Sequence, residues 1–228
     1  MYEGNNAINK AYFVSQNEDY LLLLLSEELK QPLIAINQLS EINRTDVVAQ
    51  SIGVQSKRAL RTIDNIMLCR RIHSGQIKLH FEPTHIGETA RQVSITMNDM
   101  LTQQACSSRL ILQNELGVMN ADKRVVRAIL ESLWQGLALA SSGKDQIICS
   151  ASRTKGGIRV SLRLKNDNLT AVSMVLSDNS MQPVKGLAGP AADLIAAKEL
   201  CRVAGLSLTK TSRSIGVTIP FSQQLQLL

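Results

Sequence analysis

Side chains that commonly carry out chemistry are few in this chain and widely spaced. The three histidines are His73, His80 and His85, and the four cysteines are Cys69, Cys106, Cys149 and Cys201. The histidine spacings match neither a zinc site nor a catalytic triad, and the cysteines form no Cys-x-x-Cys pair. We therefore expect isolated core thiols in a reducing compartment, no metal site and no cofactor. Imidazole can accept a phosphoryl group, but neither His73 nor His80 falls on an exposed helical face.

The composition is that of a globular protein with an aliphatic core. Of the 228 residues, 44% are hydrophobic and only 3% are aromatic, which suits helix packing and argues against base stacking on single-stranded nucleic acid. A formal net charge of +6 is compatible with nucleic acid, an anionic membrane or an acidic protein as partner. Because lysines and arginines are scattered along the sequence, we interpret the charge as a solvated basic surface and do not expect nucleic acid as a partner.

The N-terminal segment predicts neither a secretory leader nor a membrane span. Met1 is followed by polar residues, and the leucine run at 21–25 is far shorter than the ~20 residues needed to cross a bilayer. We therefore expect a cytoplasmic protein with no membrane segment in this chain.

Two long helices are predicted over about residues 6–72. In the first, apolar residues recur every three or four positions within 22–39, and Pro32 is expected to kink the helix. The second should end near His73, where Gly75 stops it. Two helices cannot enclose a core, so we expect a four-helix bundle formed by two chains. Packing of the hairpin against the rest of the same chain remains the alternative.

From about residue 76 onward, helical and strand patterns follow one another in the order of a two-layer α+β sandwich. Helices are predicted at 86–104, 122–140 and 191–203, and strands at 77–81, 109–116, 146–151, 158–164, 168–176, 206–211 and 215–221. The expected domains are therefore a helical hairpin at 1–75 and a sandwich at 76–228.

The segment 26–33, Ser-Glu-Glu-Leu-Lys-Gln-Pro-Leu, resembles the dimerisation-helix signature of sensor histidine kinases, Ser-His-Glu-Leu-Arg-Thr-Pro-Leu. Glu27 stands where the family carries its phosphoacceptor histidine, and a carboxylate cannot take a phosphoryl group to nitrogen. Residues 71–79 resemble the phrase that ends the same helices. The resemblance covers most of the chain and implies a dimeric four-helix bundle, followed by the ATP-binding domain that these kinases share with gyrase and Hsp90.

Kinases of this family hold Mg-ATP with three groups of residues, and the chain departs from each. Two asparagines on one helix, the second of which binds magnesium, correspond to Glu131 and Gln135, and we expect Gln135 to be a surface amide rather than a metal ligand. No glycine occurs within 158–185, so Asp167 is the only candidate for the purine-reading carboxylate, and we expect it to be a turn residue. Asp193 falls in the phosphate loop, where it would stabilise a helix start but repel a triphosphate.

The resemblance therefore implies a pseudo-histidine kinase, a catalytically inactive homodimer that binds a response regulator receiver domain or another kinase. We predict the interface at Glu27, Glu28, Lys30 and Gln31. Glu27 either supplies the charge that a phosphate would carry or is an ordinary exposed glutamate. An ATP-independent histidine phosphotransfer relay is one alternative, but it would need the missing histidine. A basic DNA-associated regulator is the other, and a salt-dependent gel shift would test it.

Overall fold

A computed structural model describes residues 29–31, 33–43, 46–141, 145–166, 169, 172, 176 and 188–221. The chain divides into two compact units, and the boundary between them along the sequence lies between Arg70 and Arg71. The first unit is helical where it is described, and the second combines helices with β-sheets. The α+β fold class with a helical N-terminal region is thereby confirmed.

The described part of the N-terminal unit is made of helical segments. Residues 33–42 are helical, and α2 follows as Val47–His73. α2 begins at a cap, because the Asp46 carboxylate accepts a 2.8 Å hydrogen bond from the N–H of Val48. It ends where the sequence predicted, at Gly75, whose φ of +74° is a left-handed conformation that suits glycine. The kink predicted at Pro32 lies outside the described residues.

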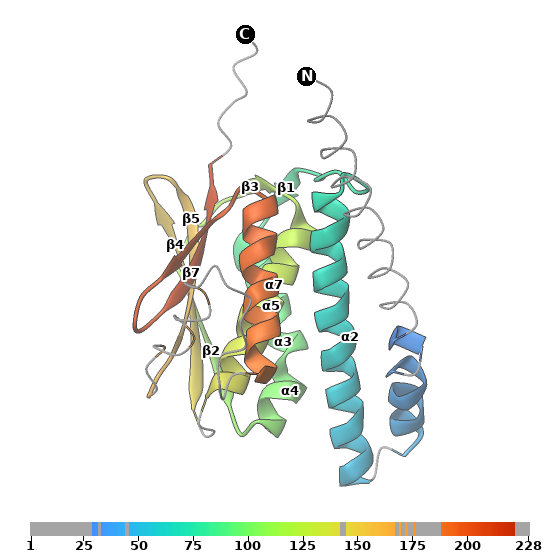
Figure 1. The fold of residues 1–228 in the computed structure, drawn as a ribbon. Helices are drawn as coiled ribbons and strands as arrows, with labels where there is room; N and C mark the ends of the chain where they lie inside the picture. The colour runs from blue at the N-terminus through green and yellow to red at the C-terminus, as the bar shows by residue number, and fades with distance from the viewer. Residues whose placement is uncertain are drawn as a thin grey trace, which may run out of the picture. The chain divides into compact units, whose positions relative to one another are not determined.

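The second unit is built on a five-stranded sheet with the strand order β2-β4-β5-β7-β6 (Figure 1). The strands are β2 Ser107–Leu112, β4 Gln146–Thr154, β5 Gly157–Leu164, β6 Ser207–Lys210 and β7 Ile215–Pro220. β2 runs parallel to β4, and the other neighbours are antiparallel. A separate antiparallel pair joins β1 Glu82–Thr84 to β3 Met119–Ala121.

One face of the five-stranded sheet is covered by helices (Figure 1). The helices of this unit are α3 Ile86–Thr96, α4 Asn98–Gln103, α5 Lys123–Ala140 and α7 Ala188–Val203. α5 lies against the sheet, and its Trp134 and Leu130 side chains are fully buried. On the sheet, Val160 and Leu162 are also fully buried. Burying each such large apolar side chain stabilises the fold by roughly 1.5–3 kcal/mol, so this layer is the core of the unit.

The strand predicted at 77–81 is wrong. Residues 78–81 have no regular structure, and β1 begins at Glu82. The alternation of apolar residues suggested a ladder, but the N–H of His80 instead donates to the side chain of Asp122 at 2.9 Å. A backbone donor committed to a side chain cannot also pair with a neighbouring strand.

Other elements differ from the prediction in their extent. The helix predicted at 86–104 is divided into α3 and α4 at Met97. Within 168–176 the described residues Val172 and Leu176 are helical and buried, so the predicted strand is wrong there. β3 was not predicted, because a three-residue strand has too few positions to show a period.

Candidate functional site

Gln135 and Asp193 meet in the interior, where α5 packs against α7. The side-chain amide Nε2 of Gln135 donates a 2.8 Å hydrogen bond to Oδ1 of Asp193. Both residues are only 1% exposed. The expectation that Gln135 is a surface amide is therefore wrong, and two positions that the sequence assigned to different nucleotide-binding groups touch each other.

Asp193 also differs from its predicted environment. α7 begins at Ala188, so Asp193 lies beyond the first turn of the helix. The helix dipole acts within that first turn, and the predicted stabilisation of a helix start does not apply. The carboxylate instead acts as a buried acceptor for α5.

Glu131 lies one helical turn before Gln135 on α5. It is 7% exposed. Its Oε1 forms a 2.8 Å ion pair with Nε of Arg127, which lies four residues earlier on the same helix. The pairing neutralises a carboxylate that would otherwise be costly to bury.

The kinase helix pattern has a second register that the sequence reasoning missed. In the family the first asparagine follows a leucine by two residues, so counting from Leu130 gives Ser132 and Gly136 as the two asparagine positions. Both are buried in α5. Neither carries a carboxamide, so the departure from the family pattern does not depend on the register chosen.

The turn after β5 is organised by Asp145. Its Oδ1 accepts hydrogen bonds from the N–H of Gln146 at 2.6 Å and of Asn166 at 3.1 Å, and the residue is 3% exposed. This carboxylate joins the start of β4 to the residues that follow β5, where the kinase family has a glycine turn. Asp167, the predicted purine-reading candidate, lies outside the described residues.

The N-terminal group of predicted interface residues is described only in part. Glu27 and Glu28 lie outside the described residues. Gln31 is exposed, whereas Lys30 is partly buried and its Nζ forms a 2.7 Å ion pair with Asp64 of α2. Lys30 therefore joins the two helical segments in addition to any contact with a partner.

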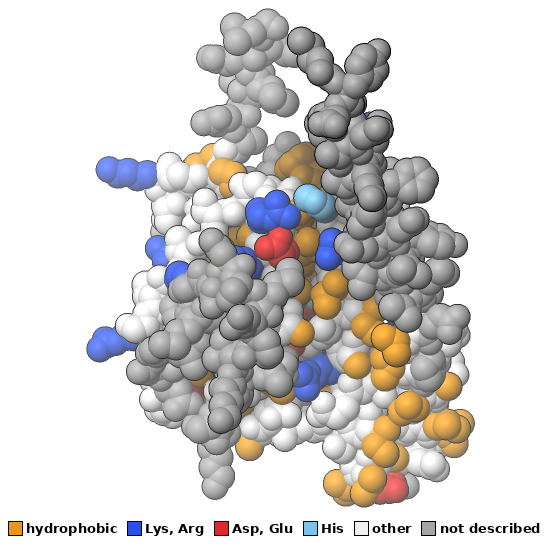
Figure 2. Space-filling model, in the orientation of Figure 1, with side chains coloured by type: hydrophobic (Ala, Val, Ile, Leu, Met, Phe, Trp, Pro, Cys, Tyr) orange, Lys and Arg blue, Asp and Glu red, His pale blue; other side chains and the backbone are white. Residues whose placement is uncertain are grey.

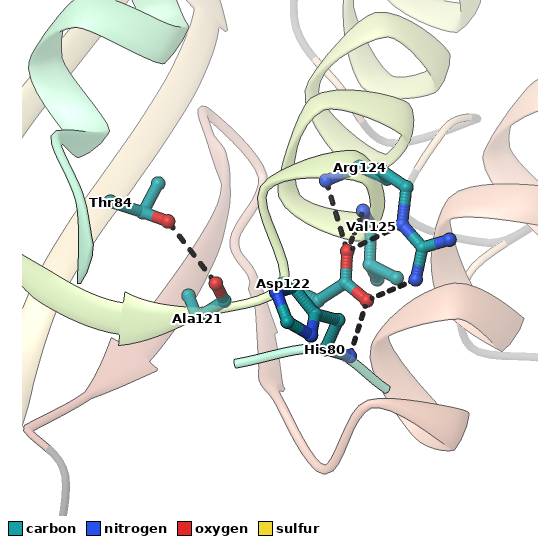
Figure 3. A network of polar contacts seen from close by, with 6 residues as sticks. All are labelled: His80, Thr84, Ala121, Asp122, Arg124 and Val125. Atoms are coloured by element: carbon teal, nitrogen blue, oxygen red, sulfur yellow. Dashed lines mark hydrogen bonds and ion pairs between the residues drawn. The ribbon is translucent and has the colours of Figure 1, made fainter. Parts of the chain in front are cut away.

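A polar network centred on Asp122 joins three segments of the second unit (Figure 3). Oδ1 caps α5 by accepting from the N–H groups of Arg124 at 3.0 Å and Val125 at 3.3 Å. Oδ2 accepts from the N–H of His80 at 2.9 Å and from Nη2 of Arg124 at 2.8 Å. The aspartate before an apolar helix was the sequence signal for the cap, but nothing in the sequence indicated the contact with His80.

The network also sets the charge state of Asp122. Burial by itself would raise the pKa of this carboxyl, but the hydrogen bonds from the Arg124 guanidinium and from the His80 and Val125 N–H groups outweigh burial. The pKa therefore lies below its ordinary value of 3.8, and the side chain is ionised at neutral pH.

An apolar pocket adjoins this network and is distinct from the Gln135–Asp193 pair. Its lining residues include Leu79, Phe81, Asn120, Ala121, Asp122, Val125, Val126, Ala204, Leu206, Ile219 and Pro220. It opens at the beginning of α5, about 18 Å along the helix from Gln135. Its walls offer few polar groups for a nucleotide.

The cysteines and histidines form no site in the described parts of the chain. All four cysteines are free and buried, which confirms the prediction of isolated core thiols. Burial raises the pKa of Cys149 and of Cys201 to about 12 in each case, so neither is a nucleophile at neutral pH. Among the residues that the structure describes, no three His, Cys, Asp or Glu side chains gather as metal ligands would.

Solved structures of sensor histidine kinases have the same fold as this chain. Full-length ShkA, in complex with AMPPNP, matches with a TM-score of 0.59 and 16% identity over 89% of this chain and 46% of ShkA, so the chain spans about half the length of that kinase. Histidine kinase AdeS of Acinetobacter baumannii matches with a TM-score of 0.56 and 12% identity over 84% of this chain and 96% of AdeS. The catalytic domain of ThkA covers 62% of this chain at a TM-score of 0.50 and 15% identity.

Sequence comparisons add no match, since no family model and no curated protein matches the chain. The histidine-kinase-like fold is therefore established by structure, and the expected resemblance is confirmed at the level of the fold. None of the helices in the described ranges is both long enough and apolar enough to span a bilayer.

Proposed function

We propose that this chain is a signalling protein of histidine-kinase-like fold that has no kinase activity and acts by binding other proteins. It dimerises through its N-terminal helices and presents the surface around Glu27, Glu28, Lys30 and Gln31 to a response regulator receiver domain or a second kinase. Four free, buried thiols fit a reducing compartment such as the cytoplasm.

The observation that carries the proposal is the buried hydrogen bond between Gln135 and Asp193. In an active kinase the corresponding region must leave an amide oxygen for magnesium and a bare backbone for phosphate. Here Nε2 of Gln135 donates to Asp193, so a buried carboxylate of the segment that the resemblance assigns to phosphate lies against the amide that it assigns to magnesium. In the other register, Ser132 and Gly136 carry no amide side chain. A buried carboxylate at this place would repel a triphosphate, and this supports the proposal that the chain does not bind a magnesium nucleotide.

Glu27 supports the same proposal from the other half of the reaction. A kinase of this class needs an imidazole nitrogen to receive the phosphoryl group, and a glutamate stands at that position in the sequence. A protein that lacks both the acceptor and the nucleotide groups could still bind other proteins through its helices.

A thermal-shift measurement with Mg-ATP tests the proposal. A ligand present at 100 times its Kd stabilises a protein by about 2.7 kcal/mol, which corresponds to a shift of several degrees. We expect no shift in Tm at millimolar Mg-ATP. ShkA, which has been solved with AMPPNP, serves as the positive control. An upward shift of several degrees in this chain would refute the proposal.

The Gln135–Asp193 pair makes a separate prediction about stability. Gln135→Ala removes the amide donor from a buried carboxylate, and we expect the free energy of unfolding in urea to fall by about 1–3 kcal/mol. Glu115→Ala, at an exposed turn residue, is the matched control and should change it by less than about 0.5 kcal/mol. Equal effects of the two substitutions would mean that the pair does not hold α5 to α7.

A further inference from the structure

Basic side chains gather on the sheet of the second unit. The five strands contain no aspartate or glutamate, and their basic residues are Arg109, Arg153, Arg159, Arg163 and Lys210. Figure 2 shows Lys and Arg side chains projecting on the side where Figure 1 places the sheet. No described helix covers that face.

Strand register places three of these arginines on the face away from the helices. Arg109 on β2 and Arg163 on β5 both pair with Ile148 of β4, and paired residues point to the same side. Arg159 precedes Arg163 by four residues on the same strand, so it shares that side. From strand geometry, Arg159 and Arg163 are about 13 Å apart, and Arg109 and Arg163 about 10 Å.

These three arginine side chains have no partner in the described part of the chain. None of them takes part in an ion pair or a side-chain hydrogen bond there. By contrast, Arg91, Arg124, Arg127 and Arg202, which lie on helices, are each paired with a carboxylate. The charge of Arg109, Arg159 and Arg163 is therefore not neutralised by any residue that the structure describes.

Gly216 leaves room for the Arg159 and Ser161 side chains to lie close to the sheet on this face. Gly216 of β7 pairs with Ser161 of β5. A Cβ added at Gly216 would lie 2.9 Å from Oγ of Ser161 and 3.2 Å from Nε of Arg159, so both atoms converge over the glycine. The Nε atom of Arg159 is buried and has no acceptor among the described residues. Because a methyl group at Gly216 would crowd these atoms, the glycine allows the Arg159 side chain to lie close to the sheet, and a phosphate would meet Arg159 through the terminal nitrogens of its guanidinium.

We propose that this face binds the phosphate backbone of double-stranded DNA, with phosphates at Arg109, Arg159 and Arg163. Arginine and the hydroxyls of serine and threonine are side chains that DNA-binding proteins direct at phosphates. The register places further hydroxyl-bearing residues on the same face, namely Ser150, Ser152, Ser207 and Thr218. The separations of about 10–13 Å between arginines are comparable to the width of about 12 Å of the DNA major groove, which phosphates border on both sides.

The composition of the face disfavours other polyanionic partners. The five strands contain no aromatic residue on which single-stranded bases would stack. Protein-binding hot spots favour tryptophan and tyrosine together with arginine, and serine and threonine are under-represented in them; this face offers arginine without the aromatic residues. Binding to a lipid surface needs apolar side chains that enter the bilayer, and among the large apolar side chains of the described strands only Ile111, at 45%, is exposed.

Fluorescence anisotropy with a labelled duplex of about 20 base pairs tests this proposal. We expect the full chain to bind with a Kd between about 10⁻⁴ and 10⁻⁶ M, regardless of sequence, and to weaken steeply between about 50 and 200 mM salt. Arg159→Gln and Arg163→Gln should each reduce the slope of log K against log salt by about 1. Gly216→Ala, whose methyl group would displace the Arg159 side chain, should weaken binding without changing the charge.

Two variants serve as matched controls. Arg91→Gln removes the same charge from helix α3, and Gly156→Ala adds a methyl group where nothing lies within 4 Å. Circular dichroism of each variant checks that it is folded. The proposal is refuted if the duplex does not bind at low salt, if Arg91→Gln weakens binding as much as Arg159→Gln does, or if phosphatidylserine vesicles bind and the duplex does not.

Discussion

At the scale of single residues, Asp122 shows how one carboxylate positions several segments. It is 4% exposed, caps α5, and receives the N–H of His80 and the guanidinium of Arg124. An N-cap alone contributes about 1 kcal/mol, and a buried donor left without its acceptor costs about 1–3 kcal/mol more. Asp122 therefore stabilises both a helix and the irregular segment before β1.

We expect Asp122→Ala to lower the free energy of unfolding by about 2–4 kcal/mol, because it removes both the cap and the acceptor for His80. Asp122→Asn retains a capping oxygen and should cost much less. Urea unfolding at pH 7 measures the difference. If the two substitutions have the same effect, the charge of the carboxylate matters more than its geometry.

The lowered pKa of Asp122 predicts a dependence of stability on pH. A carboxyl whose folded-state pKa lies below its unfolded value stabilises the fold above the unfolded pKa, and this contribution is lost as the pH falls through the folded pKa. The advantage of the wild type over Asp122→Asn should therefore be constant near neutral pH and shrink below about pH 4. An advantage that grows on acidification would contradict the assigned direction.

At the scale of elements, two buried thiols report the packing of β4 and of α7, one on each element. Cys149 on β4 is fully buried and Cys201 on α7 is 1% exposed, and burial raises the pKa of both to about 12. At pH 8 almost no thiolate is present at either position, and the thiolate is the reactive form.

We expect neither Cys149 nor Cys201 to be alkylated by iodoacetamide in the native protein at pH 8 on the timescale in which a free cysteine reacts to completion. The same protein in denaturant, where both thiols regain their ordinary pKa, is the control. Peptide mass spectrometry locates the modified residues. Rapid native labelling of Cys201 would show that α7 opens from the sheet.

At the scale of the whole molecule, the N-terminal unit leaves large apolar side chains exposed. They include Leu39 at 62%, Ile42 at 78%, Val48 at 63% and Ile52 at 45%. A helical hairpin with such a surface is stabilised when it is buried against another helical hairpin. These exposed side chains support the proposal that the chain dimerises through its N-terminal helices.

Light scattering should report twice the chain mass of 25.0 kDa. The double substitution Leu39→Glu and Ile52→Glu places charges in the proposed interface and should yield a monomer that retains its helical circular dichroism. Ile95→Glu, at a residue of α3 that is 69% exposed, is the matched control and should remain dimeric. A wild-type monomer would exclude the bundle.

Much of the fold could be predicted from the sequence because it depends on local patterns. The apolar period of α5, the cap at Asp46 and the stop at Gly75 all act within a few residues, and the structure confirms each. The order of helices and strands after residue 76 led correctly to an α+β fold, and the resemblance of the motifs led to the histidine-kinase-like fold. The missing histidine at Glu27 is likewise a property of the sequence alone.

Only the tertiary structure decided which distant residues meet. Gln135 and Asp193 are 58 positions apart and form a hydrogen bond in the interior, although the sequence predicted Gln135 to be a surface amide. Arginines that are scattered along the sequence reach one face because strand register, not sequence spacing, sets the neighbours in a sheet. The sequence by itself determined most of the helices and strands and the glutamate at position 27. Long-range pairing determined the buried Gln135–Asp193 contact and the basic face, since both depend on which elements pack together.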